Sequence, residues 1–141
     1  MPLPQALADL VNEIQDVPAN QRLEFIVELG EELPALPARY AEHPELLEAV
    51  PECQSPIFLT TEVEDGLVHL FFSAPTEAVT TRGLAAVLNE GLNQQPVDDV
   101  LSVPEDFALQ LPLEGSVSSL RLNGLTGMLM RIQRQVRRES A

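Results

Sequence analysis

Apolar side chains recur every three or four residues in four stretches of the chain, and this spacing predicts four amphipathic helices. The first covers residues 3–17 and ends because Pro18 follows. The second follows Asn20, a candidate N-cap, and ends before Pro34. Gly30 lies on the apolar face of this second helix, so we expect another element to approach its backbone closely.

The other two helices are predicted in the second half of the chain. One begins at Thr76 or a neighbour and runs to Leu92. Two short helical pieces follow it, and residues 102–105, Ser-Val-Pro-Glu, have the form of a capping box that opens the second piece. The last helix carries an apolar stripe that we expect to face the core, with arginines on its other faces. The stripe consists of Leu122, Leu125, Leu129, Ile132 and Val136.

Two runs of alternating side-chain character, residues 57–64 and 67–73, predict a pair of antiparallel strands. Asp65-Gly66 between them is a favoured sequence for a two-residue type I′ hairpin turn. This turn fixes a register in which one face of the hairpin is apolar, while the mixed face places Glu62 opposite His69. The pattern is typical of a small antiparallel sheet that helices cover on one side.

The segment between the second helix and the hairpin, residues 33–56, contains five prolines and little periodicity. We interpret it as an ordered loop with one short strand before Cys53, the only cysteine of the chain. Pro51 and Pro56 flank this cysteine, and proline has a fixed φ and no hydrogen to donate to a sheet. The sequence therefore predicts a stiff loop that offers the Cys53 thiol outward at a defined place.

The 141 residues carry a net charge of −14, and this charge is unevenly placed. Residues 1–118 hold 21 acidic side chains and three arginines, whereas residues 119–141 hold five arginines and one acidic side chain. An acidic body repels phosphate groups, so we expect neither nucleic acid nor an anionic membrane surface as a partner. The chain has no lysine, which excludes Schiff-base catalysis by this protein.

The length is typical of a single domain over residues 1–141. One cysteine cannot form an intrachain disulfide, and the residues after Met1 lack the basic and apolar segments of a signal peptide. No apolar stretch approaches the roughly 20 residues that a membrane-spanning helix needs. We therefore expect a cytoplasmic protein.

The residue inventory argues against several kinds of chemistry. Zinc and iron–sulfur sites need three or four ligands, whereas this chain offers Cys53 and two distant histidines, His43 and His69, so no metal site is expected on it alone. A Cys-His hydrolase is disfavoured because His69 faces Glu62 across the hairpin and His43 lies in a charged, proline-containing segment. The glycines fit no phosphate-binding motif.

Two interpretations of Cys53 remain open. A lone cysteine is usually a small buried hydrophobe, but the polar neighbours Gln54 and Ser55 favour a loop tip, where the sulfur acts as nucleophile and carrier. The thiolate is the reactive form, with an ordinary pKa of about 8.5. Glu52 beside the thiol raises this pKa weakly, so we expect activation to come from a distant arginine or from a partner protein.

Four segments of the chain carry a family resemblance. They are residues 22–34 (RLEFIVELGEELP), 50–59 (VPECQSPIFL), 82–88 (RGLAAVL) and 120–132 (LRLNGLTGMLMRI). Together they resemble the SufE family of sulfur-acceptor proteins. The most specific part is Cys53-Gln54-Ser55 before a hydrophobic strand, followed by Arg121 with Gly124-Leu125. Glu52 and Pro75 depart from the family, in which glycine and aspartate are frequent at these positions.

The resemblance implies a single α+β domain in which helices pack on a small antiparallel sheet of two or three strands, similar in layout to SufE and IscU. It further implies that Cys53 accepts persulfide sulfur from a SufS-type cysteine desulfurase, stimulates that enzyme and relays sulfur to a SufBCD-type iron–sulfur cluster scaffold. Arg121, Gln54, Ser55 and Glu52 would support Cys53. Pyridoxal phosphate would belong to the desulfurase, so no cofactor is expected on this chain.

In this interpretation the protein is an accessory factor rather than a stand-alone enzyme, and a monomer or weak homodimer. Two other hypotheses stay open. A non-catalytic regulator would dock on a desulfurase through its acidic surface or its arginine-bearing last helix, and would keep stimulating it after Cys53→Ser. A structural interaction module would hold Cys53 as an incidental buried thiol that reacts slowly with thiol reagents.

Overall fold

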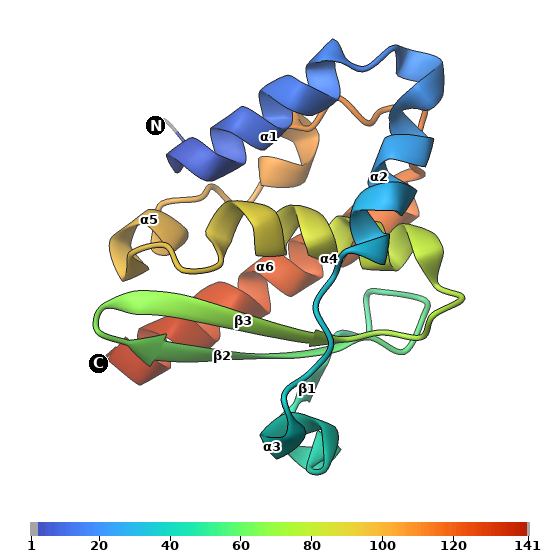
Figure 1. Cartoon of the computed structure of the whole chain (residues 1–141). Coiled ribbons are helices and arrows are strands. Elements are labelled where there is room, and N and C mark those ends of the chain that lie inside the picture. Colours follow the sequence, from blue (N-terminus) through green and yellow to red (C-terminus); the bar gives the residue numbers. More distant parts are fainter. Residues whose placement is uncertain (1–2, 141) are drawn as a thin grey trace.

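A three-stranded antiparallel sheet in the order β1-β2-β3 lies under a layer of helices in the computed structural model, which describes residues 3–140 (Figure 1). The strands are β1 (Glu48–Ala49), β2 (Phe58–Glu64) and β3 (Leu67–Ser73). The helices are α1 (Gln5–Asp16), α2 (Arg22–Glu31), α3 (Ala38–Ala41), α4 (Val79–Leu92), α5 (Val97–Leu101) and α6 (Ser119–Ser140), with short 3₁₀ turns at Ala19–Gln21, Pro44–Leu46 and Phe107–Gln110. This confirms the predicted α+β class.

The β2-β3 hairpin has the predicted register, with Val63 opposite Val68 and Leu59 opposite Phe72. Asp65 and Gly66 have φ of 55° and 78°, as a type I′ turn requires. One face of the hairpin is buried under α4 and α6, and the other face is partly exposed. The alternation in the sequence therefore predicted both strands and the face that packs on the helices.

Helix α4 runs through the middle of the molecule, and α2 crosses it at a contact between two glycines (Figure 1). A β-carbon built on Gly30 of α2 would come within 2.6 Å of the backbone nitrogen of Gly83 on α4. The two backbones therefore touch, which confirms that Gly30 allows a close approach. On the other side of the core, α6 presents the predicted stripe, and its members from Leu125 to Val136 are buried.

Three predicted helix starts differ from those in the structure. Asn20 lies inside a 3₁₀ turn, and α2 begins at Arg22 without a side-chain cap. Helix α4 begins at Val79 instead of Thr76, because the Ala78 amide closes a turn onto the Pro75 carbonyl at 3.1 Å. The third, the capping box at 102–105, fails because the Ser102 hydroxyl donates back to the Asp99 carbonyl at 2.7 Å.

The segment from residue 33 to residue 56 contains the predicted short strand, β1, which pairs with β2. It also contains α3 and a 3₁₀ turn, which its many prolines and weak periodicity did not indicate. No helix in the described part of the chain, residues 3–140, is both long and apolar enough to cross a membrane.

Candidate functional site

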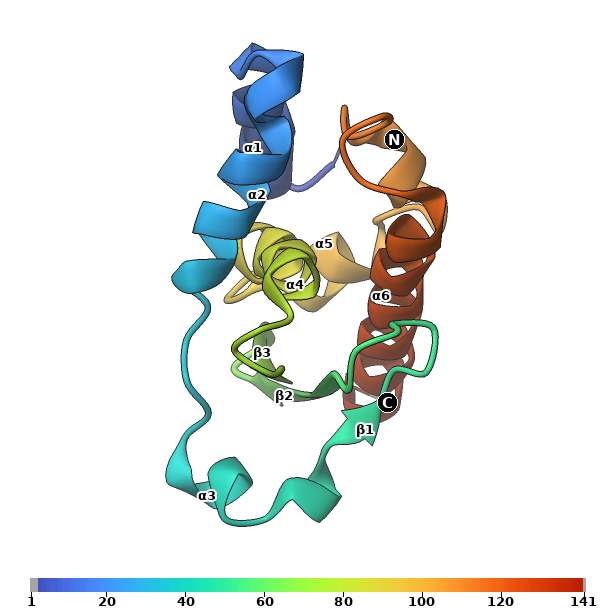
Figure 2. The ribbon, with the colours of Figure 1, turned by 90° about the vertical axis from the view of Figure 1, so that its right-hand side faces the viewer.

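Cys53 lies in residues 50–57, which join β1 to β2 and which we call the Cys53 loop. The base of the loop is closed by a hydrogen bond from the Val50 amide to the Ile57 carbonyl, 3.0 Å long. Within it, the Cys53 amide donates to the Val50 carbonyl at 3.1 Å, and the Ile57 amide donates to the Ser55 carbonyl at 2.8 Å. The loop, in green between β1 and β2, lies alongside α6 (Figure 2).

The Cys53 loop packs on two glycines of α6. A β-carbon built on Gly124 would come within 2.8 Å of the Cys53 sulfur, and one built on Gly127 would come within 2.8 Å of the Glu52 carboxyl carbon. Real β-carbon contacts this short essentially never occur. The loop therefore keeps its place only because α6 has no side chains at these two positions. Gly124 belongs to the family motif noted in the sequence, and this contact gives it a physical role.

The thiol of Cys53 is half-buried and faces α6, where it contacts the edge of the hydrophobic core. The sulfur is therefore shielded in this conformation, in contrast to the prediction that the loop offers it outward. The loop itself is at the surface, since Pro51, Glu52, Gln54 and Pro56 are exposed. The physical reason for the difference is Gly124, which leaves a space on α6 that the sulfur fills.

Burial raises the pKa of the Cys53 thiol to about 11. The Glu52 carboxylate raises this pKa further, as predicted, while the Arg131 guanidinium lowers it. At neutral pH the resting sulfur is therefore a protonated thiol, which is a weak nucleophile. The resting conformation protects the sulfur and does not activate it.

Charged side chains tie β1 and the Cys53 loop to α6. Arg131 donates from Nη1 to Glu52 at 2.9 Å, and its Nε lies 3.6 Å from the Glu48 carboxylate. Arg134 also pairs with Glu48, and the Gln135 amide donates to Glu48 at 2.8 Å. The hydrogen bond from Arg131 is the largest cause that holds the pKa of Glu52 below its ordinary value.

The arginine beside the Cys53 loop is Arg131, whereas the family resemblance pointed to Arg121. Arg121 lies on the first turn of α6, and its Nη1 is 3.5 Å from the Thr81 hydroxyl on α4. Within residues 3–140 it makes no hydrogen bond or ion pair with the loop. No local sequence signal marks Arg131, because its contact with the loop depends on how the loop packs across α6.

The other predicted site residues occupy different places. Gln54 is exposed at the loop tip, and the Ser55 carbonyl accepts the hydrogen bond that shapes the end of the loop. His69 lies opposite Glu62 in the register, but the Glu62 carboxylate binds Arg39 at 3.0 Å and the Tyr40 hydroxyl at 2.5 Å. Glu62, the predicted partner of His69, therefore forms its hydrogen bonds with Arg39 and Tyr40 of α3 instead.

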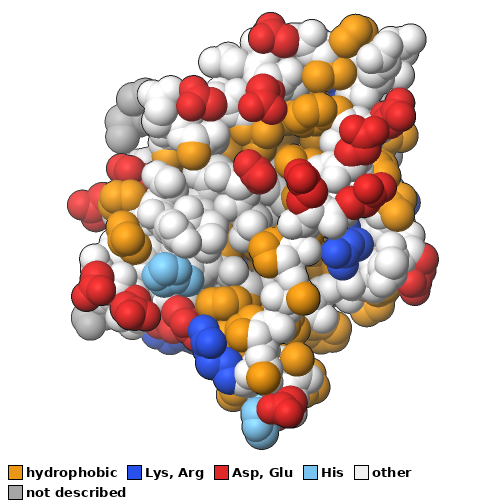
Figure 3. Space-filling view, in the orientation of Figure 1, with side chains coloured by type: hydrophobic (Ala, Val, Ile, Leu, Met, Phe, Trp, Pro, Cys, Tyr) orange, Lys and Arg blue, Asp and Glu red, His pale blue; other side chains and the backbone are white. Residues whose placement is uncertain are grey.

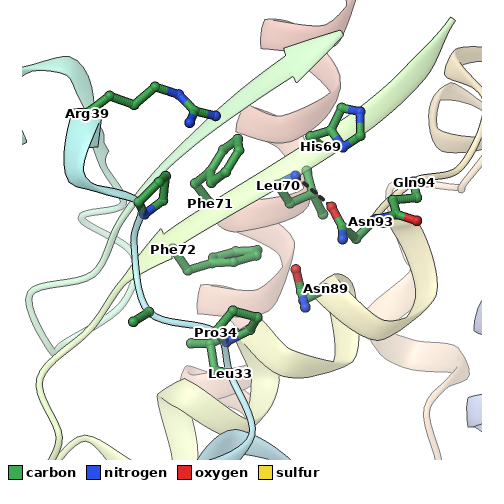
Figure 4. A pocket seen from close by; sticks show the side chains of 12 residues that line it. Leu33, Pro34, Arg39, His69, Leu70, Phe71, Phe72, Asn89, Asn93 and Gln94 are labelled. Atoms are coloured by element: carbon green, nitrogen blue, oxygen red, sulfur yellow. Dashed lines mark hydrogen bonds between the residues drawn. The ribbon is translucent and has the colours of Figure 1, made fainter. Parts of the chain in front are cut away.

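A separate pocket of about 310 Å³ lies between β3 and the segment that follows α2 (Figure 4). Phe71, Phe72 and Asn89 line it, and the Asn93 side chain accepts a hydrogen bond from the Leu70 amide at 2.9 Å. Cys53 is not among its lining residues, so this pocket is not part of the thiol site. Across residues 3–140, no three His, Cys, Asp or Glu side chains are grouped to hold a metal ion.

Comparisons with known proteins agree over nearly the whole chain. The family model described as "SufE: Fe-S metabolism associated domain" matches residues 8–136. An uncharacterised SufE-like protein of Mycobacterium tuberculosis is 48% identical over 136 residues, which cover 96% of this chain and 94% of that protein. SufE-like protein 1 of Arabidopsis thaliana, named chloroplastic/mitochondrial, is 30% identical over 134 residues, which cover 94% of this chain and 35% of that protein.

The fold is also similar to a solved structure. The solution structure of a hypothetical protein from Thermus thermophilus superposes with a TM-score of 0.86 at 34% sequence identity. The match covers 99% of this chain and 98% of the other. The arrangement of helices on a small sheet is therefore shared along the full length of both chains.

Proposed function

This chain belongs to the SufE family of Fe-S metabolism associated domains, and we propose that within this metabolism it is a sulfur acceptor and carrier with Cys53 as the acceptor. The observation that supports this role most directly is the position of the sole cysteine. Cys53 lies in a surface loop closed at its base, yet its sulfur rests against Gly124. A carrier needs both properties, because the sulfur must reach a partner and must be shielded from free thiols between transfers.

The proposed reaction is a persulfide transfer. The Cys53 thiolate attacks the outer sulfur of a cysteine persulfide on a SufS-type cysteine desulfurase. The sulfur–sulfur bond of the donor breaks as the new bond to Cys53 forms, and the donor cysteine leaves as a thiolate that takes up the proton lost by Cys53. The outer sulfur keeps its oxidation state, so the step needs no oxidant or reductant.

Activation of Cys53 requires movement of the Cys53 loop, because burial holds its pKa at about 11. If the donor draws the loop off α6, the thiol regains an ordinary pKa of about 8.5, and its thiolate fraction near neutral pH rises on the order of a hundredfold. We assign Arg121, Gln54 and Ser55 to supporting roles on this same surface, in which Arg121 would turn from Thr81 toward the displaced loop.

We propose that Cys53 passes its sulfur on to a SufBCD-type cluster scaffold. The protein would act in the cytoplasm, as a monomer or weak homodimer. Pyridoxal phosphate would reside on the desulfurase, so this chain would be an accessory protein rather than an enzyme on its own. The Arabidopsis relative carries a chloroplastic/mitochondrial name, which concerns that protein alone.

The test of the carrier role compares the wild-type protein with Cys53→Ser as stimulators of a cysteine desulfurase. We expect the wild type to raise the turnover of free cysteine and the variant to lose this effect, because it cannot remove the persulfide. The urea midpoint of the variant verifies that it folds. Retained stimulation by Cys53→Ser would contradict the carrier role and support the regulator, which acts by docking alone.

A further inference from the structure

Glu52, the residue before Cys53, is bound to α6 by a well-defined ion pair. Its carboxylate accepts a hydrogen bond from Arg131 Nη1 at 2.9 Å, and the same nitrogen donates to the Gly127 carbonyl at 3.0 Å. The side chains of Arg131 and Glu52 are 19% and 39% exposed. Because the guanidinium is largely buried and also bound to the helix backbone, it holds the carboxylate at one place on α6.

The surface of α6 is shaped to receive the Glu52 side chain. A β-carbon on Gly127 would come within 2.8 Å of the Glu52 carboxyl carbon and 3.1 Å of its β-carbon. Gly127 therefore forms a notch under Glu52, and Arg131 stands one helical turn further along.

We propose that Glu52 and Arg131 form a latch that holds the Cys53 loop on α6 with the sulfur against Gly124, and that Arg131 is the positioning residue of this latch. Opening the loop then requires the Glu52–Arg131 pair to separate. Arg131 stays in place when this happens, because its Nε lies 3.6 Å from Glu48 and its Nη1 binds the Gly127 carbonyl. The role of the latch in sulfur transfer rests on the proposed function. The existence of the latch is independent of that function.

The test is the rate at which iodoacetamide alkylates the native protein at a fixed pH. Cys53 is the only thiol of the chain, so the rate reports on one site. The reagent is uncharged and is neither attracted nor repelled by a change of charge. We expect Arg131→Gln and Glu52→Gln each to raise the rate about three- to tenfold, the effect of losing one charged hydrogen bond at a partly exposed site.

The two substitutions separate the latch from simple electrostatics. Arg131 lowers the pKa of Cys53 and Glu52 raises it. Through charge alone, Arg131→Gln would therefore slow alkylation and Glu52→Gln would speed it. A latch predicts faster alkylation for both, because either change releases the loop. Arg131→Lys should restore most of the protection, since the ammonium group still donates to Glu52.

Two further variants control for other effects. Arg138→Gln removes the same charge from an exposed position of α6, and we expect it to leave the rate unchanged. Gly127→Ala fills the notch under Glu52 and should raise the rate, even though alanine favours a helix more than glycine does. The urea midpoint of each variant shows whether the increase comes from the loop or from global unfolding.

An unchanged or slower rate for Arg131→Gln and for Gly127→Ala, in folded protein, would overturn the latch. This result is independent of the carrier role, because alkylation needs no desulfurase. Conversely, a protein with a working latch that never acquires sulfur from a desulfurase would contradict the proposed function and leave the latch standing.

Discussion

At Cys53, shielding and reactivity oppose each other. The space above Gly124 takes the sulfur out of water, and the same burial raises its pKa to about 11. The Cys53 thiol is thus shielded in this conformation and becomes a good nucleophile only when the loop moves.

Gly124→Ala tests the role of this space at the scale of one residue. The added β-carbon would come within 2.8 Å of the Cys53 sulfur, so we expect the thiol to be displaced and its alkylation to become roughly tenfold faster. Asn123→Ala, at an exposed neighbouring position, is the matched control. Equal alkylation rates in both variants and the wild type would show that Gly124 does not determine how the sulfur is shielded.

The sequence identified Cys53 but not the cation beside it. The prolines and polar neighbours of Cys53 are local signals, and so is the effect of Glu52 on its pKa. The contact with Arg131 joins residues 79 positions apart and depends on how the loop lies across α6. Such a contact follows from tertiary packing, so no local pattern indicated Arg131.

At the scale of elements, the predictions succeeded where one local rule decides the structure. Alternation and the Asp65-Gly66 turn determine the hairpin register, and a three-to-four spacing determines the buried stripe of α6. The predicted capping box failed because the Ser102 hydroxyl has another backbone partner nearby, the Asp99 carbonyl. Helix α3 is too short, at four residues, to leave a periodic pattern.

Helix α3 is fixed to the mixed face of the sheet through Glu62, which gives a pH-dependent prediction. Hydrogen bonds from Arg39 and Tyr40 hold the pKa of Glu62 below its ordinary value of 4.5, with Arg39 as the largest cause. The ionised carboxylate therefore stabilises the fold above about pH 4.5, and this stabilisation is lost as the pH falls through the lower pKa of the folded state.

We expect Glu62→Gln to lower the free energy of unfolding by about 1 kcal/mol at pH 7, because it weakens the hydrogen bond with Tyr40 and removes the ion pair. The difference in unfolding free energy between variant and wild type should vanish well below pH 4.5, where the protonated Glu62 is neutral like the glutamine. Urea denaturation at a series of pH values measures it. A difference that stays constant with pH would show that the charge of Glu62 is not involved.

Across the whole molecule, acidic side chains outnumber basic ones, and most of the arginines lie on one helix, α6. Acidic side chains are spread over the face shown in Figure 3, with few basic groups among them. Four of the eight arginines lie between residues 131 and 138, on the helix that receives the Cys53 loop. Cys53 therefore lies beside the helix that holds most of the arginines, of which Arg131 and Arg134 are paired with Glu52 and Glu48.

Sulfur transfer to Cys53 is detected without intermediate steps by the intact mass of the protein after incubation with a cysteine desulfurase and free cysteine. We predict a gain of about 32 Da, one sulfur atom, that maps to Cys53, disappears on reduction and is absent from Cys53→Ser. If the desulfurase turns over cysteine and bears a persulfide itself while Cys53 gains no mass, Cys53 is not a sulfur acceptor.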